Sequence, residues 1–165
     1  MIYLHKNLIY TFIVSVILQI SLLADDINLD LIAQKPSNSD KHLLIFLHKT
    51  GCSYCEKMAE FTLDYDPISK LIKDAFVFID INVKLDGEVI YKNFRGSKRE
   101  FAIYLKRDFY PSTVFMDTKG DIVFAQSGYV DEENYLPALR YVETKSYKKM
   151  PFDEFENDYE FKKSL

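Results

Sequence analysis

The sequence predicts an α/β domain with a central mixed sheet and helices on both faces, and three observations predict it. Two apolar runs of strand length alternate with segments of helical periodicity. Two further strand-like runs, separated by a Lys–Gly turn, follow as an antiparallel hairpin. The composition of the 165 residues, 48% hydrophobic and 15% aromatic, is that of a globular chain. Strands that alternate with helices indicate parallel pairing under helices on both faces, and the hairpin adds an antiparallel edge.

Residues 1–24 are expected to be a secretory signal peptide. Lys6 and the amino group precede an apolar run over 8–23, and acids follow at Asp25 and Asp26. The run is shorter than the ~20 residues that span a bilayer. We therefore expect cleavage after Ala24 and a periplasmic protein, with an uncleaved N-terminal membrane anchor as the alternative.

The first half of the domain alternates helical and strand patterns. The continuous apolar run at 42–48 fits a strand buried on both faces, and so does the run at 76–83. Pro67 fits the first position of a helix. The expected elements are a short helix and polar turn at 27–40, a strand at 42–48, a helix from 53, a helix from 66 and a strand at 76–83.

The second half of the domain begins with a polar loop that contains Gly87 and Gly96. Pro137 lies inside the last helical segment, so that helix either starts late, near Leu136, or kinks there. The expected elements are a helix near 97–107, strands at 112–117 and 121–127, and a helix over 131–147. The domain is thus assigned to 25–147.

Residues 148–165 are expected to form a C-terminal helical extension. Pro151 stands at its start, and Phe152, Phe155 and Tyr159 share one side. This helix either docks on the domain surface or serves as a partner-binding element.

The stretch "TGCSYCEKM" holds Cys52 and Cys55, the only cysteines of the chain. They are interpretable as a redox pair, half of a metal site or a structural staple. A staple at this spacing closes almost no loop, so it would stabilise little. A closed zinc site needs four ligands, and His42 and His48 do not form a second paired motif. We expect His42 at the surface and His48 at a strand end that lines the site.

The position of the cysteines favours the redox pair. Cys52 lies where a strand ends and a helix begins, and the first N–H groups of a helix stabilise a negative charge. A thiolate there has a lowered pKa and is the reactive species. Cys55 follows one turn later, close enough to resolve a mixed disulfide formed at Cys52.

The stretch "FYPSTVF" contains the second candidate element, Tyr110–Pro111. Pro111 is interpretable as a strand-initiating proline or as a cis-proline that faces the cysteines. Its position between the third helix and the hairpin favours the cis-proline.

With these motifs, residues 38–147 resemble the thioredoxin superfamily. The stretches "LIFLHKTGCSYCEKM" and "FRGSKREFAIYLKRDFYPSTVFMDTKGDIVFAQSGY", with the aromatic tail, are similar to exported bacterial SoxW-like thioredoxins. The resemblance implies a thioredoxin fold, Cys52 as nucleophile and Cys55 as resolving thiol. It also implies a cis Pro111 and pairing of the Tyr110 backbone with substrate, while Ser53 and Tyr54 border the substrate as the inner dipeptide.

The chain also departs from the thioredoxin pattern. Gly51 stands where the usual tryptophan precedes the first cysteine, and Phe46 stands where thioredoxins carry a buried acid. The dipeptide Ser53–Tyr54 is nearer the CxYC of glutaredoxins and periplasmic disulfide isomerases. The charge of Glu56 opposes a very low thiol pKa. These features favour a reductase or isomerase over a strong oxidant.

The sequence therefore predicts a periplasmic thiol–disulfide oxidoreductase that reduces protein disulfides without a bound cofactor or metal. The expected partners are disulfide-containing exported proteins and a membrane electron donor that re-reduces the pair. We expect a monomer, and the formal charge of −4 argues against a nucleic-acid partner. The alternative is a redox-inactive or metal-binding interaction module of the same fold.

Overall fold

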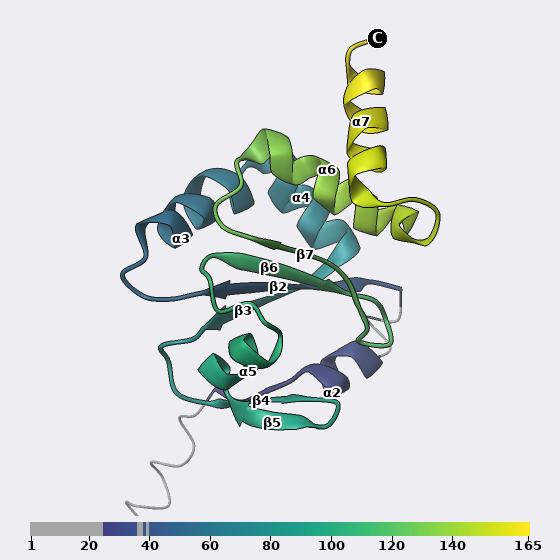
Figure 1. The fold of residues 1–165 in the computed structure, drawn as a ribbon. Coiled ribbons are helices and arrows are strands. Elements are labelled where there is room, and N and C mark those ends of the chain that lie inside the picture. Colours follow the sequence, from purple (N-terminus) through teal and green to yellow (C-terminus); the bar gives the residue numbers. More distant parts are fainter. Residues whose placement is uncertain (1–24, 36–37, 39) are drawn as a thin grey trace, which may run out of the picture.

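The computed structural model of the protein describes residues 25–35, 38 and 40–165 (Figure 1). The predicted signal peptide at 1–24 lies outside these residues. The described chain forms a layered α/β fold, in which a central sheet separates two groups of helices.

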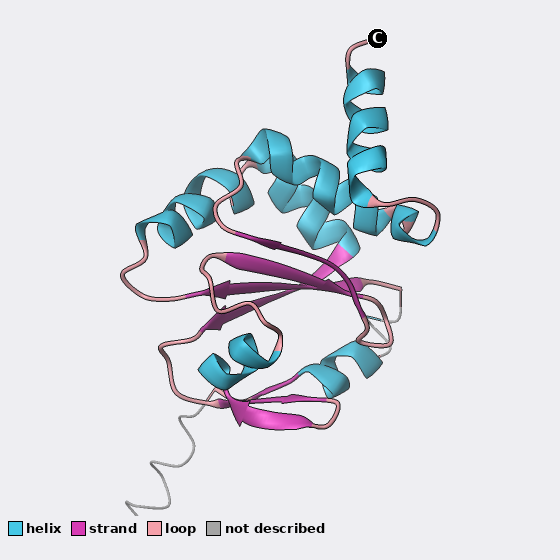
Figure 2. Cartoon of the chain, in the orientation of Figure 1, coloured by secondary structure: helices cyan, strands magenta, loops and turns pink. Residues whose placement is uncertain are grey.

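The central sheet is mixed and has the strand order β3-β2-β6-β7 (Figure 2). β2 pairs in parallel with β3 and antiparallel with β6, and β6 pairs antiparallel with β7. The strands are β2 (His42–His48), β3 (Phe76–Asn82), β6 (Ser112–Met116) and β7 (Ile122–Ser127). The predicted mixed sheet is confirmed, although only one of its pairings is parallel.

Burial differs between the two parallel strands. Every residue of β2 except His48 is buried, as expected of a central strand. β3 alternates instead, with Phe78 and Asp80 exposed, so the expectation of burial on both faces is wrong for 76–83. The physical reason is position, because β3 is an edge strand of the sheet.

Helices cover both faces of the sheet, as predicted (Figure 1). One face packs under α3 (Ser53–Lys57), the π-helix η2 (Met58–Leu63), α4 (Asp66–Ala75) and α6 (Glu132–Glu143). The other face packs against α2 (Leu29–Gln34) and α5 (Lys98–Tyr104). Phe46, Phe115 and Tyr135 lie in the first core, and Leu43, Val114 and Phe101 lie in the second.

A second, three-stranded sheet replaces the predicted polar loop around Gly87 and Gly96. It has the order β1-β4-β5, from β1 (Ile27–Asn28), β4 (Glu88–Tyr91) and β5 (Phe94–Ser97). Val89 and Tyr91 are buried and alternate with less buried neighbours, which is the two-residue period of a strand. The sequence did not indicate this strand because it is short and flanked by charged residues. The Tyr91 hydroxyl donates to the Gly120 carbonyl at 2.7 Å, which ties this sheet to the β6–β7 turn.

Helix α6 starts at Glu132 after the cap Asp131, so a late start near Leu136 is wrong. Pro137 lies inside the helix, where its missing N–H would have bonded to the carbonyl of Glu133 in the exposed first turn. That carbonyl can bind water instead, which explains why the proline is tolerated. The helix ends at Glu143 rather than 147, because Lys145 has a left-handed φ of 57° before the 3₁₀ turn η3 (Ser146–Lys148).

The predicted C-terminal helix is α7 (Phe152–Lys163). Its first turn docks through aromatic contacts: the Phe152 ring lies 4.6 Å from Phe124 and 5.3 Å from Tyr141, between centroids. No residue of α7 is fully buried, and the helix projects from the domain in Figure 1. At the other end of the helix, Lys163 Nζ lies 2.9 Å from Glu133 Oε1 of α6. The extension thus docks through aromatic contacts at its start and one exposed ion pair at its end, and a partner-binding role stays a prediction.

His42 is buried, so its predicted surface position is wrong. It is 2% exposed, and its Nε2 lies 3.0 Å from the Tyr147 hydroxyl, at the turn before the extension. Burial, together with the charge of Lys145, lowers the pKa of His42 below its ordinary value of 6.5.

The lowered pKa predicts a pH dependence of stability. Below pH 6.5 the unfolded chain binds a proton at His42 more readily than the folded protein does. The free energy of unfolding is therefore expected to be at its full value above pH 6.5 and to fall as the pH drops below it. Denaturant titrations at pH 7.5 and 5.5 on the protein and on His42→Phe measure this contribution. An identical pH dependence in the two proteins would contradict it.

Candidate functional site

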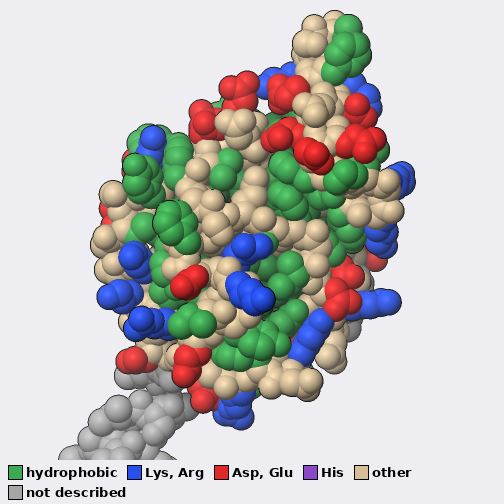
Figure 3. Space-filling view, in the orientation of Figure 1, with side chains coloured by type: hydrophobic (Ala, Val, Ile, Leu, Met, Phe, Trp, Pro, Cys, Tyr) green, Lys and Arg blue, Asp and Glu red, His purple; other side chains and the backbone are tan. Residues whose placement is uncertain are grey.

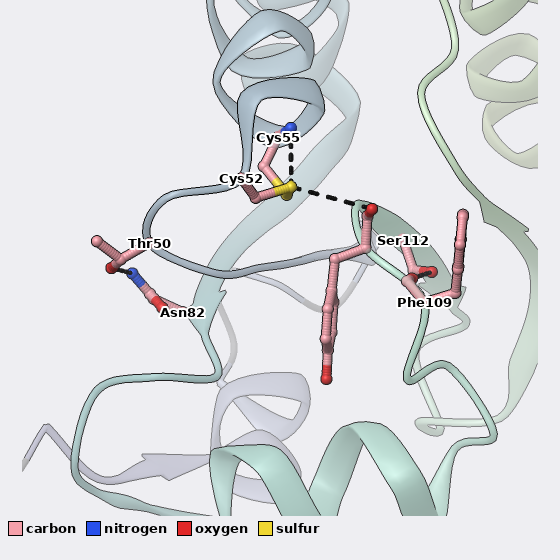
Figure 4. Close-up of a disulfide and its surroundings, with 7 residues drawn as sticks. Thr50, Cys52, Cys55, Asn82, Phe109 and Ser112 are labelled. Carbon is pink, nitrogen blue, oxygen red and sulfur yellow. Dashed lines mark hydrogen bonds between the residues drawn. A yellow bond between two sulfur atoms is a disulfide. The ribbon is translucent and has the colours of Figure 1, made fainter.

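The cysteine pair lies at the end of the central strand β2, where helix α3 begins. Cys52 is the N-cap residue of α3, and Cys55 lies inside its first turn. The two sulfurs are joined as a disulfide, with 5.2 Å between the Cα atoms (Figure 4). The predicted strand–cysteine–helix arrangement is confirmed.

The two cysteines differ in exposure and in hydrogen bonding. The Cys55 N–H donates to the Cys52 sulfur at 3.2 Å, and no comparable bond reaches the Cys55 sulfur within the described part of the chain. Cys52 is 9% exposed and Cys55 2%. When the pair is reduced, the N–H group favours the thiolate form of Cys52, which is also the less buried residue of the two.

The chain segment before β6 forms the opposite wall of the site. The Tyr110–Pro111 peptide bond is cis, which confirms that prediction, and the Tyr110 carbonyl oxygen lies 4.0 Å from the Cys52 sulfur. In the disulfide this is a contact, since Cys52 has no proton to donate. The Ser112 hydroxyl donates to the Phe109 carbonyl and fixes this segment (Figure 4). Burial raises the pKa of the Tyr110 phenol, with a further rise from Asp108 that Arg99 opposes.

Ser53 and Tyr54 lie on the exposed rim of the site. Tyr54 is 64% exposed, and its ring lies 6.3 Å from the ring of Tyr129. Lys57 lies over the same Tyr129 ring, 4.4 Å from its centroid. The structure thus brings Cys52, Cys55 and Tyr110 into one place with the two rim residues beside them, and the role of Ser53 and Tyr54 in substrate binding stays a prediction.

Polar contacts hold the loop between β2 and Cys52. The Asn82 side chain donates to the Thr50 hydroxyl at 2.8 Å (Figure 4). His48 Nε2 lies 2.5 Å from Asp80 Oδ1, and its ring stacks on Phe46. His48 is thus engaged by β3 and the core rather than by the cysteines.

Gly51, directly before the first cysteine, has a φ of 73°. A side chain there would meet nothing within 4 Å, so the requirement for glycine comes from the backbone and not from space. The left-handed conformation costs an L-residue about 1–2 kcal/mol. Gly51→Ala is therefore expected to lower the free energy of unfolding by about that amount, as measured by urea denaturation. A loss below about 0.3 kcal/mol, within the usual range for surface substitutions, would contradict this reason for the glycine.

Sequence reasoning missed two features of the site. One is Phe109, whose side chain is 68% exposed beside the cis bond. The other is a cavity lined by Lys49, Arg99 and Tyr110, among others. The only sequence signal for the cavity was the group of basic residues in "YLKRDFYP". Such a group is typical of any solvent-exposed protein surface.

Within the described residues, no three His, Cys, Asp or Glu side chains gather as a metal site would require. None of the described helices has both the length and the apolar character needed to cross a membrane.

The sequence pattern of the thioredoxin-like domain matches residues 29–143. No curated protein matches the chain. Among solved structures, it is similar to a thioredoxin-fold protein from Helicobacter pylori, with 24% identity, a TM-score of 0.60 and coverage of 73% of this chain and 80% of the other. A thioredoxin from Thermus thermophilus has 21% identity, a TM-score of 0.51 and coverage of 64% and 78%. An oxidoreductase named DsbH has 14% identity, a TM-score of 0.52 and coverage of 73% and 87%.

These structures share the fold, and the domain match covers the cysteine pair together with the cis-proline segment. A thioredoxin-like fold that carries a bonded CxxC pair supports thiol–disulfide oxidoreductase chemistry in general. The chain belongs to the thioredoxin-like domain family.

Proposed function

We propose that the protein is an exported thiol–disulfide oxidoreductase that reduces disulfides of other exported proteins. The observation that supports this most is the asymmetry of the pair: the Cys52 sulfur accepts the Cys55 N–H, and Cys52 is the less buried residue of the two. One sulfur is thus suited to attack and the other to resolve.

In the reducing direction, the Cys52 thiolate attacks one sulfur of the substrate disulfide. A Cys52–substrate disulfide forms, the substrate S–S bond breaks, and the leaving thiolate takes a proton. The Cys55 thiolate then attacks the Cys52 sulfur, which forms the Cys52–Cys55 disulfide and releases the second substrate thiol. Two electrons pass from the protein dithiol to the substrate. The carbonyl oxygen of Tyr110, next to Cys52, is positioned to accept a backbone N–H of the bound substrate.

The charges near the pair favour a reductase. The exposed Glu56 follows Cys55 directly and disfavours a thiolate. The cations closest in sequence to the pair are Lys49 and Lys57, and each lies over a tyrosine ring, Lys49 over Tyr110 and Lys57 over Tyr129. We therefore expect a potential nearer the thioredoxin end of the scale, about −270 mV, than the strong-oxidant end, about −120 mV.

Equilibration of the protein in a series of glutathione redox buffers, followed by alkylation and mass spectrometry, measures this potential. A reversible two-electron couple supports the oxidoreductase. A midpoint above about −160 mV would make the protein an oxidase instead. The absence of any reversible couple, or the presence of stoichiometric metal after purification, would favour the binding-module alternative.

Export and partners are part of the proposal and rest on the sequence. The predicted signal peptide supports a periplasmic location, and a compartment that is oxidising requires an electron donor across the membrane to keep a reductase reduced. Cell fractionation, with N-terminal sequencing of the recovered chain, tests the location. A chain beginning at Asp25 in the periplasmic fraction is expected, whereas recovery from the cytoplasm would contradict export.

A further inference from the structure

A cavity of about 350 Å³ lies beside the redox site. Its charged lining consists of Lys49, Lys84, Arg99 and Asp108, and its remaining lining consists of Val83, Ile103 and Tyr110. It is therefore a concave, basic site with an apolar part, in a protein whose formal charge is −4.

Tyr110 connects the cavity to the reacting sulfur. Its carbonyl oxygen lies 4.0 Å from the Cys52 sulfur, while its ring lines the cavity and lies 5.7 Å from Lys49 Nζ. An extended chain advances ~3.3–3.6 Å per residue. A substrate whose sulfur is bonded to Cys52 can thus place a side chain only a few residues away in the cavity.

The cations of the cavity are not held by carboxylates of the described residues, although Lys49 lies over the Tyr110 ring. No ion pair found between described residues uses Lys49, Lys84 or Arg99. Arg99 and Asp108 line the same cavity as Tyr110. Three cations and one carboxylate give the cavity a net positive charge, which attracts an anion more strongly in a concave site. The planar guanidinium of Arg99 can form two parallel hydrogen bonds with a carboxylate.

The two sides of the disulfide differ in character. Thr50 and Asn82 lie on one side of it in Figure 4; Thr50 directly follows Lys49, and Asn82 lies two residues before Lys84. Figure 3 shows basic side chains gathered near the loops that follow β2 and β3. The exposed Phe109 lies on the opposite side (Figure 4). A bound segment therefore meets a basic cavity in one direction along its chain and an aromatic surface in the other.

We propose that this cavity binds a carboxylate side chain of the polypeptide substrate, located a few residues to one side of the reacting cysteine. The inference rests on the proposed function and adds a substrate class to it: disulfides flanked on one side by Asp or Glu. Lys49, Lys84 and Arg99 bind the carboxylate, and Phe109 contacts apolar residues on the other side of the cysteine.

Synthetic peptides that carry one cysteine as a mixed disulfide with 2-pyridinethiol test the proposal. Attack by Cys52 on the peptide sulfur releases pyridine-2-thione, and Cys55 then displaces the peptide thiol. The peptides differ only in having Glu, Gln or Lys two residues before or two residues after the cysteine. The second-order rate constant for thione release is measured with the reduced full chain, at low and high salt.

We expect Glu to react roughly tenfold faster than Gln in one of the two placements only, with Lys slower still and the preference lost at high salt. The variant Lys49→Gln/Lys84→Gln/Arg99→Gln is expected to bring the Glu-to-Gln ratio close to one. The variant Lys70→Gln/Lys149→Gln/Lys162→Gln changes the total charge equally at exposed positions outside the cavity, and it should keep the ratio.

Equal rates for Glu and Gln, or the same gain in both placements, would contradict carboxylate binding in the cavity. Either result would leave the proposed function standing. A protein that releases no thione from any peptide would overturn the proposed function itself, and with it this inference. The mixed disulfide of glutathione with 2-pyridinethiol offers carboxylates on a small molecule with the same leaving group. If it releases thione faster than the best Glu peptide and loses that advantage in the cavity variant, the polypeptide assignment is wrong.

Discussion

Replacing Cys52 with serine is expected to reduce disulfide reductase activity to the level of a protein-free control. The attacking group must be a thiolate, and Cys52 is the less buried cysteine and the one whose sulfur accepts the Cys55 N–H. Reduction of insulin, followed by turbidity, measures the loss. Alkylation of the reduced protein at mildly acidic pH should likewise label Cys52 before Cys55.

Cys55→Ser is the matched variant, because it removes the second sulfur and keeps the first. It should also lose turnover, yet it should accumulate a mixed disulfide at Cys52 that is visible as an added mass and released by dithiothreitol. The same trap, applied in cells, identifies substrates. Turnover retained by Cys52→Ser, or preferential alkylation of Cys55, would reverse the roles assigned to the two cysteines.

Phe46→Ala is expected to cause the largest loss of stability among simple truncations near the site, about 3–5 kcal/mol. Phe46 is 2% exposed in the central strand β2, within the core under α3 and α6, and its ring stacks on His48. Its removal leaves a cavity that the surrounding strands cannot close. Denaturant unfolding of the oxidised protein measures the change.

Phe161→Ala is the control for Phe46→Ala. The same side chain is removed from α7, where Phe161 is 66% exposed, so the change should stay within about 0.5 kcal/mol. A loss below about 1 kcal/mol for Phe46→Ala would show that β2 does not depend on this ring. The stability of the core around β2 would then have to come from the other buried residues of the strand.

The sequence was sufficient for the elements whose signals are local. The apolar run of β2, the proline near the start of α4 and the cysteines between strand and helix each carry their signal within a few residues. The position of Pro111 before the hairpin was likewise enough to predict its cis bond.

The features that the sequence did not reveal depend on partners far along the chain. Strands β4 and β5 are short and flanked by charges, and β4 is completed by β1 about sixty residues earlier. His42 is a polar residue at a strand start, and it is buried by contacts with Phe76 and Tyr147, which are both distant in the sequence. The cavity beside Tyr110 combines residues that follow β2 and β3 with residues of α5 and the loop after it, so no window of sequence contains it.

The central position of β2 has a consequence for how the protein folds. Cys52 follows β2, but Tyr110 precedes β6, which pairs with β2 with Leu43 opposite Met116. Three helices and three strands, with the π-helix η2, lie between β2 and β6 in the sequence. Contacts so distant in sequence form slowly, and β6 is synthesised well after the cysteines. Cys52 and Cys55 can therefore form their disulfide before the Tyr110 segment, the opposite wall of the site, is in place. Because the chain has no other cysteine, that early oxidation can produce only the native disulfide within the chain, and folding needs no isomerase to correct it.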